Sequence, residues 1–161
     1  MEYFVLPVCW HQQTLYLIYF SNDQDGVLLE GGGIAAFPDA EKAVAYARKR
    51  KHKLQPPMES LDLLTVSAWA GSRSTRLPDA SLLYRSWNFF GDVASSLEKA
   101  DSYLGYDEEW LPIHQELFWG CNMPGISQSA ERYEVDLSQA ETRQLRLIMK
   151  SGLEIFQQGL K

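Results

Sequence analysis

The sequence predicts a single α+β domain over residues 1–161, with a small, mainly antiparallel β-sheet and helices packed on it. The first third of the chain contains short runs of β-branched and aromatic residues that are separated by turn residues. From Asp39 onward, apolar residues instead recur at helical spacing in several separate stretches. Strands and helices do not alternate along the chain, which argues against a doubly wound sheet. The expected order of elements is βββ(β)αβααα.

Strands are expected where β-branched and aromatic residues cluster: 3–10, 14–20, 27–30 and, for the bracketed fourth strand, 34–37. Polar residues 11–13 separate the first two strands, and Asp25-Gly26 ends a strong turn signal. Pro7 has no backbone N–H to donate, so we expect the first strand near an edge of the sheet. The three glycines at 31–33 indicate a bend or bulge between strands.

The next expected elements are a helix and a further strand. Asp39 is a good N-cap for an alanine-rich helix over residues 40–53. The basic run 48–53 ends this helix, where cations complement the negative end of the helix dipole. Residues 61–69 form an apolar, partly β-branched run that predicts a strand, followed by an exposed loop over 70–77.

Three helices are expected in the second half of the chain. The first covers residues 79–98, and its inward face is formed by apolar residues that recur every three or four positions: Leu83, Trp87, Phe90, Ala94 and Leu97. The second covers 107–119 and carries Pro112, which fits only in a first turn or at a kink. The third opens with a capping-box pattern at 138–141 and is expected to kink at 151–152.

Acidic charge is concentrated between residues 92 and 136. The whole chain has a formal net charge of −6, yet this segment alone carries ten acids against Lys99 and Arg132, a net charge of about −8. The acids are interleaved with aromatic residues: Tyr103, Tyr106, Trp110, Phe118, Trp119 and Tyr133. Acids steer a basic partner toward a surface, and Tyr and Trp anchor the contact. The alternative is that the acids are merely solvated and the aromatics belong to the core.

The composition disfavours several classes of protein. A net charge of −6 argues against general affinity for nucleic acid or for an anionic membrane. No signal peptide and no apolar run long enough to span a bilayer is visible, so a cytoplasmic protein with reduced thiols is expected. Cys9 and Cys121 do not suggest a disulfide framework, and three isolated histidines predict no metal site. No cofactor is expected.

Other motifs fall short of a catalytic or binding signature. Glycines 31–33 are followed by apolar residues, whereas a phosphate-binding loop leads directly into a helix. Cys121 and His114 could form a thiol–imidazole pair, but Cys121 lies past the end of its predicted helix. The basic run 48–53 is short and belongs to an acidic protein, so it supports nucleic-acid binding only weakly.

Four short segments resemble a known family. They are Phe37-Pro38-Asp39 before an alanine-rich helix, Trp87-Asn88-Phe89-Phe90-Gly91-Asp92, Glu116-Leu117-Phe118-Trp119-Gly120-Cys121-Asn122-Met123-Pro124 and Gly152-Leu153-Glu154-Ile155-Phe156. Together they resemble the immunity proteins of contact-dependent growth inhibition and related polymorphic-toxin systems. The resemblance implies a cytoplasmic, non-enzymatic protein. Such a protein would bind the C-terminal toxin domain of a secreted adhesin, often a nuclease, and block its active site.

Charge and predicted exposure nominate a surface for such a toxin. A nuclease cleft is commonly basic because it binds phosphates, so its inhibitor benefits from acids that imitate phosphates and from aromatics that fill pockets. The nominated residues are Asp101, Tyr103, Tyr106, Asp107, Glu108, Glu109, Glu131 and Glu134. Two other classes remain open: a different interaction module, such as a regulatory subunit, and an enzyme that uses Cys121 or the acid cluster.

Overall fold

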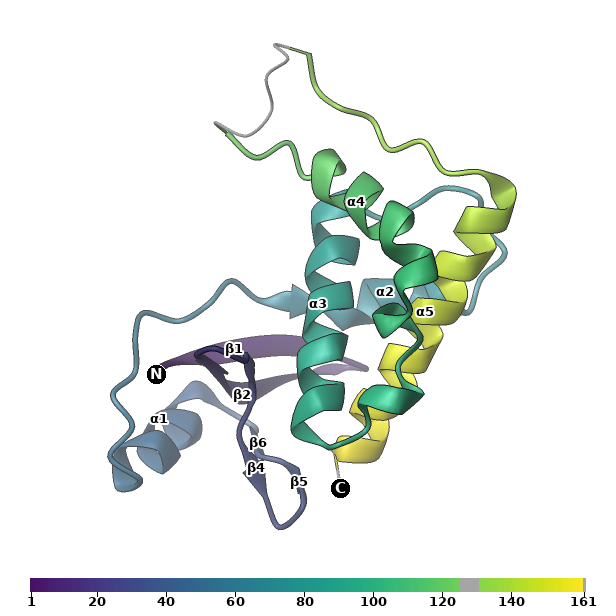
Figure 1. Ribbon diagram of the computed structural model, residues 1–161. Helices are drawn as coiled ribbons and strands as arrows, with labels where there is room; N and C mark the ends of the chain where they lie inside the picture. The colour runs from purple at the N-terminus through teal and green to yellow at the C-terminus, as the bar shows by residue number, and fades with distance from the viewer. Residues whose placement is uncertain (125–130, 161) are drawn as a thin grey trace.

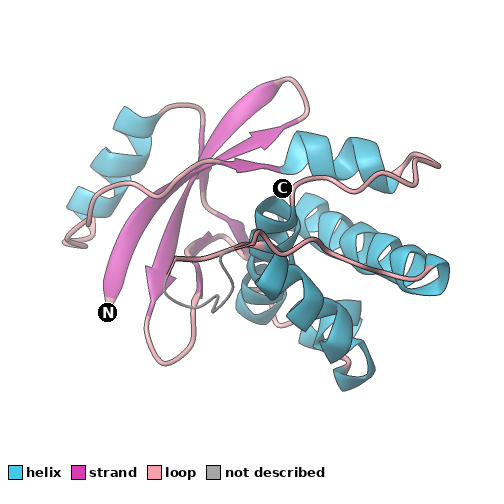
Figure 2. Cartoon of the chain, turned by 90° about the horizontal axis from the view of Figure 1, so that it is seen from above, coloured by secondary structure: helices cyan, strands magenta, loops and turns pink. Residues whose placement is uncertain are grey.

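The computed structural model describes residues 1–124 and 131–160. A mixed β-sheet has one helix on its first face and a group of helices on its second (Figures 1 and 2). The helices are α1 (Ala40–Lys49), α2 (Leu63–Ala70), α3 (Ala80–Ser96), α4 (Leu111–Gly120) and α5 (Gln139–Gly159). The strands are β1 (Glu2–Trp10), β2 (Gln13–Ser21), β3 (Gly26–Val27), β4 (Leu29–Glu30), β5 (Gly33–Ile34), β6 (Ala36–Phe37) and β7 (Leu61–Asp62). Helix α1 lies on one face, and α2, α3 and α5 lie on the other, with α4 packed on α3. The predicted α+β class is confirmed.

The sheet has the strand order β3-β2-β1-β7, and β6 also pairs with β2. β1 and β2 form a long antiparallel hairpin, in register from Glu2 opposite Ser21 to Trp10 opposite Gln13. β7 runs parallel to β1 for two residues. The sheet is therefore mainly antiparallel, as the sequence predicts.

The expected edge position of the first strand is wrong, because β1 lies between β2 and β7. Pro7 is tolerated there for a local reason. The carbonyls of Tyr3 and Val5 accept hydrogen bonds from Gln55 and Met58, on the side of β1 away from β2. Since backbone groups alternate along a strand, Pro7 faces that same side, and β7 pairs with β1 only beyond it. The missing N–H therefore interrupts no bond of the β1–β2 hairpin.

The two faces of the hairpin support separate cores. Leu6 and Leu17 face the helix group and belong to its apolar core. Val5 and Ile18 point the opposite way and are buried on the α1 side of the sheet. Side chains alternate along a strand, so Tyr19 points to the same face as Leu17, toward α3.

The bend or bulge predicted between strands at glycines 31–33 is a tight hairpin turn, in which Gly31 and Gly32 form the turn and Gly33 begins β5. Gly31 and Gly32 have φ values of 61° and 81° and link β4 to β5. Two successive left-handed residues in such a turn favour glycine. The strand predicted over 27–30 is divided between β3 and β4.

The strand predicted over residues 61–69 is wrong beyond its first two residues. Asp62 caps α2, because its carboxylate accepts hydrogen bonds from the backbone N–H and the hydroxyl of Thr65. The buried positions of α2 follow helical spacing: Leu63, Val66, Trp69 and Ala70. A capping residue followed by a helical stripe outweighs the β propensity of the segment.

The other helices begin close to their predicted positions, with side-chain caps at Asp39, Asp79 and Ser138. Helix α1 ends at Lys49 and not at 53, because Lys51 adopts a positive φ. Helix α5 runs unbroken through Gly152, where any side chain would collide with the ring of Phe90 on α3. This glycine serves close helix packing instead of the predicted kink. None of the described helices combines the length and the apolar character that a bilayer crossing requires.

The helix predicted over 107–119 starts later, as α4 at Leu111, with Pro112 in its first turn. Before it, the chain forms three short 3-10 turns: η1 (Ala100–Ser102), η2 (Leu104–Tyr106) and η3 (Glu108–Trp110). These turns lead the chain from the end of α3 to the start of α4. We call residues 100–110 the 3-10 segment, and it contains six of the eight residues that the sequence nominates for binding.

Candidate functional site

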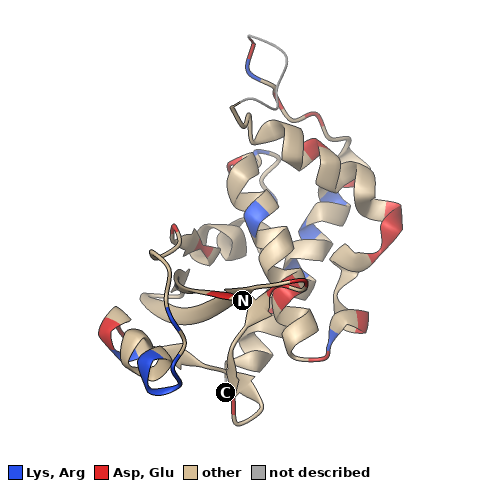
Figure 3. Cartoon of the chain, turned by 60° about the vertical axis from the view of Figure 1, so that its left-hand side comes forward, with Lys and Arg blue, Asp and Glu red and all other residues tan. Residues whose placement is uncertain are grey.

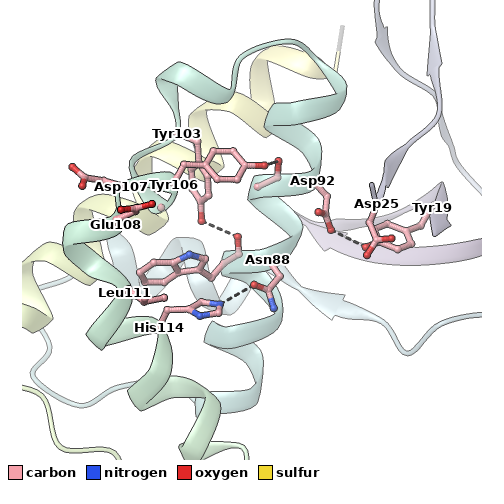
Figure 4. A pocket seen from close by; sticks show the side chains of 13 residues that line it. Tyr19, Asp25, Asn88, Asp92, Tyr103, Tyr106, Asp107, Glu108, Leu111 and His114 are labelled. Atoms are coloured by element: carbon pink, nitrogen blue, oxygen red, sulfur yellow. Dashed lines mark hydrogen bonds between the residues drawn. The ribbon is translucent and has the colours of Figure 1, made fainter. Parts of the chain in front are cut away.

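A groove of about 560 Å³ opens between β2, α3 and the 3-10 segment (Figure 4). Tyr19 of β2 and Asp25 of the following turn form one side, and Trp87, Asn88 and Asp92 of α3 form the floor. The opposite side is built by the 3-10 segment and the first turns of α4. Four carboxylates line this groove: Asp25, Asp92, Asp107 and Glu108. We call it the acidic groove.

A hydrogen bond between the sheet and α3 fixes the inner end of the groove. The hydroxyl of Tyr19 donates to Oδ2 of Asp92 over 2.7 Å. Burial raises the pKa of Asp92 to about 6, and the charge of Asp25 adds to this, while the hydrogen bond from Tyr19 acts in the opposite direction. Burial, followed by the hydrogen bond to Asp92, raises the pKa of Tyr19. Near neutral pH the groove therefore holds a carboxylate at its inner end whose charge is sensitive to its surroundings.

Two tyrosines attach the 3-10 segment to α3. Tyr103 is only 3% exposed, and its hydroxyl donates to the Trp87 carbonyl over 2.8 Å. The hydroxyl of Tyr106 donates to the Gly91 carbonyl, one turn further along α3. Burial raises the pKa of both tyrosines, so both remain neutral donors at physiological pH. Because these bonds hold the segment, Asp107 and Glu108 are kept at the rim of the groove.

The other end of the groove is polar but uncharged. Nε2 of His114 on α4 lies 2.9 Å from Oδ1 of Asn88 on α3, and burial lowers the pKa of His114 (Figure 4). Its ring packs between those of Tyr84 and Trp87, with centroids 4.9 and 5.2 Å away. A neutral imidazole engaged with an amide is placed for recognition or packing. The thiol of Cys121 donates to its own helix at the Leu117 carbonyl, so the structure gives no support to a Cys121–His114 pair.

The nominated residues of the 3-10 segment fall into three positions. Tyr106, Asp107 and Glu108 line the groove together with the buried Tyr103, and Tyr106 is 49% exposed. Asp101 and Glu109 are exposed on the same segment but lie outside the groove lining. The predicted exposure of Tyr103 is wrong, because its ring packs in the core against Phe90 and Tyr106. Its role in the structure is to support the groove from within.

Glu131 and Glu134 lie apart from the acidic groove. They follow the far end of α4, a helix of ten residues that is about 15 Å long. Glu134 lines a separate hollow together with Arg76 and Arg132, so the charge there is mixed. The single acidic surface that the sequence suggests is therefore divided into two regions.

Several groove residues escaped the sequence reasoning. The sequence places Asp25 in a turn, Tyr19 in a strand and Trp87 in the core, and the placements of Tyr19 and Trp87 are confirmed; what the sequence does not predict is that the three residues line one groove. The available signal was on α3, where Asn88 and Asp92 stand one turn apart beside the apolar stripe. Polar residues that border a buried face at helical spacing indicate where a groove can open beside the helix. Asp25 offered no comparable signal.

The chain shows no match to known protein families, to curated proteins or to solved structures. Within residues 1–124 and 131–160, no three His, Cys, Asp or Glu side chains are grouped as metal ligands. The fold and the site thus define a small α+β domain with an anionic groove that has aromatic walls. Carboxylates and tyrosine rings arranged in this way are suited to recognising a cationic group.

Proposed function

We propose that this protein is an immunity protein that binds a cognate toxin domain and neutralises it by occluding a basic active site. The observation that carries the proposal is the acidic groove, where four carboxylates from three separate chain segments converge beside Tyr106 and Trp87. No Lys or Arg side chain belongs to its described lining. The resemblance of the four sequence segments to immunity proteins agrees with this interpretation.

The physical basis is electrostatic steering followed by anchoring. Carboxylates at the rim, Asp107 and Glu108, accelerate the approach of a basic surface. The half-exposed ring of Tyr106 then offers an amphipathic contact of the kind that dominates binding energy at interfaces. Leu111, which is exposed and also lines the groove, extends the apolar part of the contact. A toxin nuclease that loses access to its own cleft is inactive without any chemical step.

A different interaction module is the second candidate, and the same groove supports it. A basic segment of a partner that is not a toxin would meet the same carboxylates and the same ring. The two candidates differ in what happens to a cell that makes the partner. Only an immunity protein restores growth.

The test is co-expression with a candidate toxin encoded by a neighbouring gene. We expect the wild-type protein to rescue growth and to co-purify with the toxin domain. A variant with Asp107→Lys and Glu108→Lys should lose both properties, whereas Glu131→Lys with Glu134→Lys should keep them. Co-purification without rescue would favour the second candidate, and the absence of both would contradict the proposal.

A further inference from the structure

A third hollow, of about 300 Å³, lies between the loop that follows α2 and the N-terminal half of α5. Figure 1 shows this loop running beside α5. Three arginines line the hollow, together with three hydroxyl-bearing side chains: Arg73, Arg143, Arg146, Ser74, Thr75 and Thr142. No acidic side chain belongs to its described lining. We call it the arginine pocket.

Arg146 is held rigidly in the arginine pocket. Its Nη2 donates to the Ser74 carbonyl over 2.7 Å, and its guanidinium carbon lies 4.5 Å from the centre of the Trp69 ring. Its Nε is buried and has no hydrogen-bond partner among the described residues. A carbonyl and an aromatic ring position this guanidinium, and neither of them is an anion. The positive charge of Arg146 is therefore not compensated by these contacts.

The charges of the arginine pocket are not neutralised within the described part of the chain. Among the described residues, the ion pairs join Lys42 to Asp39 and Arg50 to Glu30, and neither pair involves a residue of the arginine pocket. Three guanidinium groups gathered without a counter-ion in a protein of net charge −6 indicate a site for an anion.

The donor set favours a phosphate over a carboxylate. Guanidinium groups pair with oxyanions through two parallel N–H bonds, and hydroxyl groups add single bonds. One carboxylate has two oxygens and satisfies one such fork, whereas a phosphate presents three or four oxygens in different directions. Arginines from the loop and from α5 approach the pocket from two different chain segments. This arrangement matches a tetrahedral oxyanion.

We propose that the arginine pocket binds a phosphate group, either as the free anion or as the monoester of a small molecule. A nucleic-acid strand fits less well, because the protein has a net charge of −6 and the adjoining hollow mixes Arg76 and Arg132 with Asp79, Glu134 and Asp136, so no continuous basic track leads away from the pocket. The proposal is independent of the acidic groove. It holds or fails whether or not the protein binds a toxin.

The test is titration of the full chain with inorganic phosphate at constant ionic strength, followed by isothermal calorimetry and by NMR of the arginine side chains. We expect saturable binding with a dissociation constant below about 1 mM, with shifts at Arg73, Arg143 and Arg146. Arg73→Gln with Arg143→Gln should weaken binding about tenfold or more, since both residues are exposed and their loss leaves the core intact. The matched control, Lys49→Gln with Lys53→Gln, removes two exposed charges at the end of α1 and should bind as the wild type does.

A second titration, with glycerol 3-phosphate, distinguishes the two sources of phosphate. Tighter binding of the ester assigns the site to a phosphorylated small molecule, and tighter binding of inorganic phosphate assigns it to the free anion. Three results would overturn the proposal: no saturable binding, equal weakening in the control variant, or tighter binding of a single-stranded oligonucleotide than of either small probe.

Discussion

Two acidic, tyrosine-bearing stretches of this chain look alike in sequence and differ in structure. In the 3-10 segment, the hydroxyls of Tyr103 and Tyr106 donate to backbone carbonyls of α3. In the stretch 131–136, the hydroxyl of Tyr133 instead donates to Glu116 over 2.6 Å. The tyrosines of the first stretch thus donate to backbone acceptors, which leaves Asp107 and Glu108 available at the groove. The second stretch is attached to α4 by a hydrogen bond in which a carboxylate, that of Glu116, is the acceptor.

The difference shows that density of charge does not make a recognition surface on its own. In the first stretch, anchoring tyrosines bring acids from separate segments to one hollow. In the second, Arg132 stands among the acids, and Glu134 faces a hollow that also holds Arg76. Figure 3 shows a third charged region, the basic end of α1, well away from α4. The surface is therefore divided into regions of distinct charge.

Charge reversal should produce the largest contrast between the two stretches. Asp107→Lys with Glu108→Lys is expected to weaken binding of the cognate toxin domain about 100-fold, mainly through slower association at low salt. Glu131→Lys with Glu134→Lys makes the same change of charge outside the groove and should alter affinity less than about threefold. Association rates measured at several salt concentrations check both values. Equal losses in the two variants would show that total charge, and not the groove, governs binding.

Removal of the tyrosine hydroxyls should give the next largest contrast, in stability. Tyr103→Phe removes the buried hydrogen bond from this hydroxyl to the Trp87 carbonyl and is expected to lower the free energy of unfolding by about 1 kcal/mol. Tyr133→Phe removes a hydrogen bond at an exposed position and should cost less. Urea denaturation of the two variants measures the difference. A larger loss in Tyr133→Phe would mean that the second stretch is the better anchored one.

The pH dependence of stability gives a smaller contrast, centred on Asp92. Its pKa in the folded protein is about 6, above the ordinary value of 3.8, so the folded state holds the proton more tightly. The stability contributed by this proton is present below about pH 4 and is lost as the pH rises through 6. Asp92→Asn cannot titrate and should therefore gain about 1 kcal/mol relative to the wild type between pH 4 and pH 7, after allowance for solvent screening.

Urea denaturation across that pH range tests the expectation for Asp92. Asp101→Asn, which removes an exposed carboxylate of the 3-10 segment, reports the effect of losing one charge from the region. If Asp92→Asn follows the same pH profile as the wild type, the carboxylate is not desolvated in the way the groove geometry implies.

Much of the fold follows from local signals in the sequence. Side-chain caps such as Asp39 and Asp79, and the apolar stripe of α3, predict helices because the interactions that define them lie within a few residues. The strand predicted over 61–69 failed where two local signals competed, and the cap at Asp62 prevailed. Pro7 is tolerated inside the sheet because of the segment that pairs with the far side of β1, and no pattern in the residues near Pro7 predicts that segment.

The site was less accessible to sequence reasoning, because it is assembled across long distances in the chain. Asp107 and Glu108 stood out by charge, but Asp25 reaches the same groove from more than 80 residues away. The burial of Tyr103 arises from a hydrogen bond to a helix carbonyl and from ring packing, neither of which changes its appearance in sequence. Residue type reveals candidate chemistry, whereas the path of the backbone decides which candidates meet.

The most direct test of the acidic groove as the binding surface is amide hydrogen exchange of the full chain with and without the proposed toxin partner. We expect slower exchange on binding in the 3-10 segment from 103 to 110 and in the turn around Asp25, with little change in residues 131–136. Protection confined to 131–136, with the 3-10 segment exchanging as it does in the unbound protein, would contradict this account.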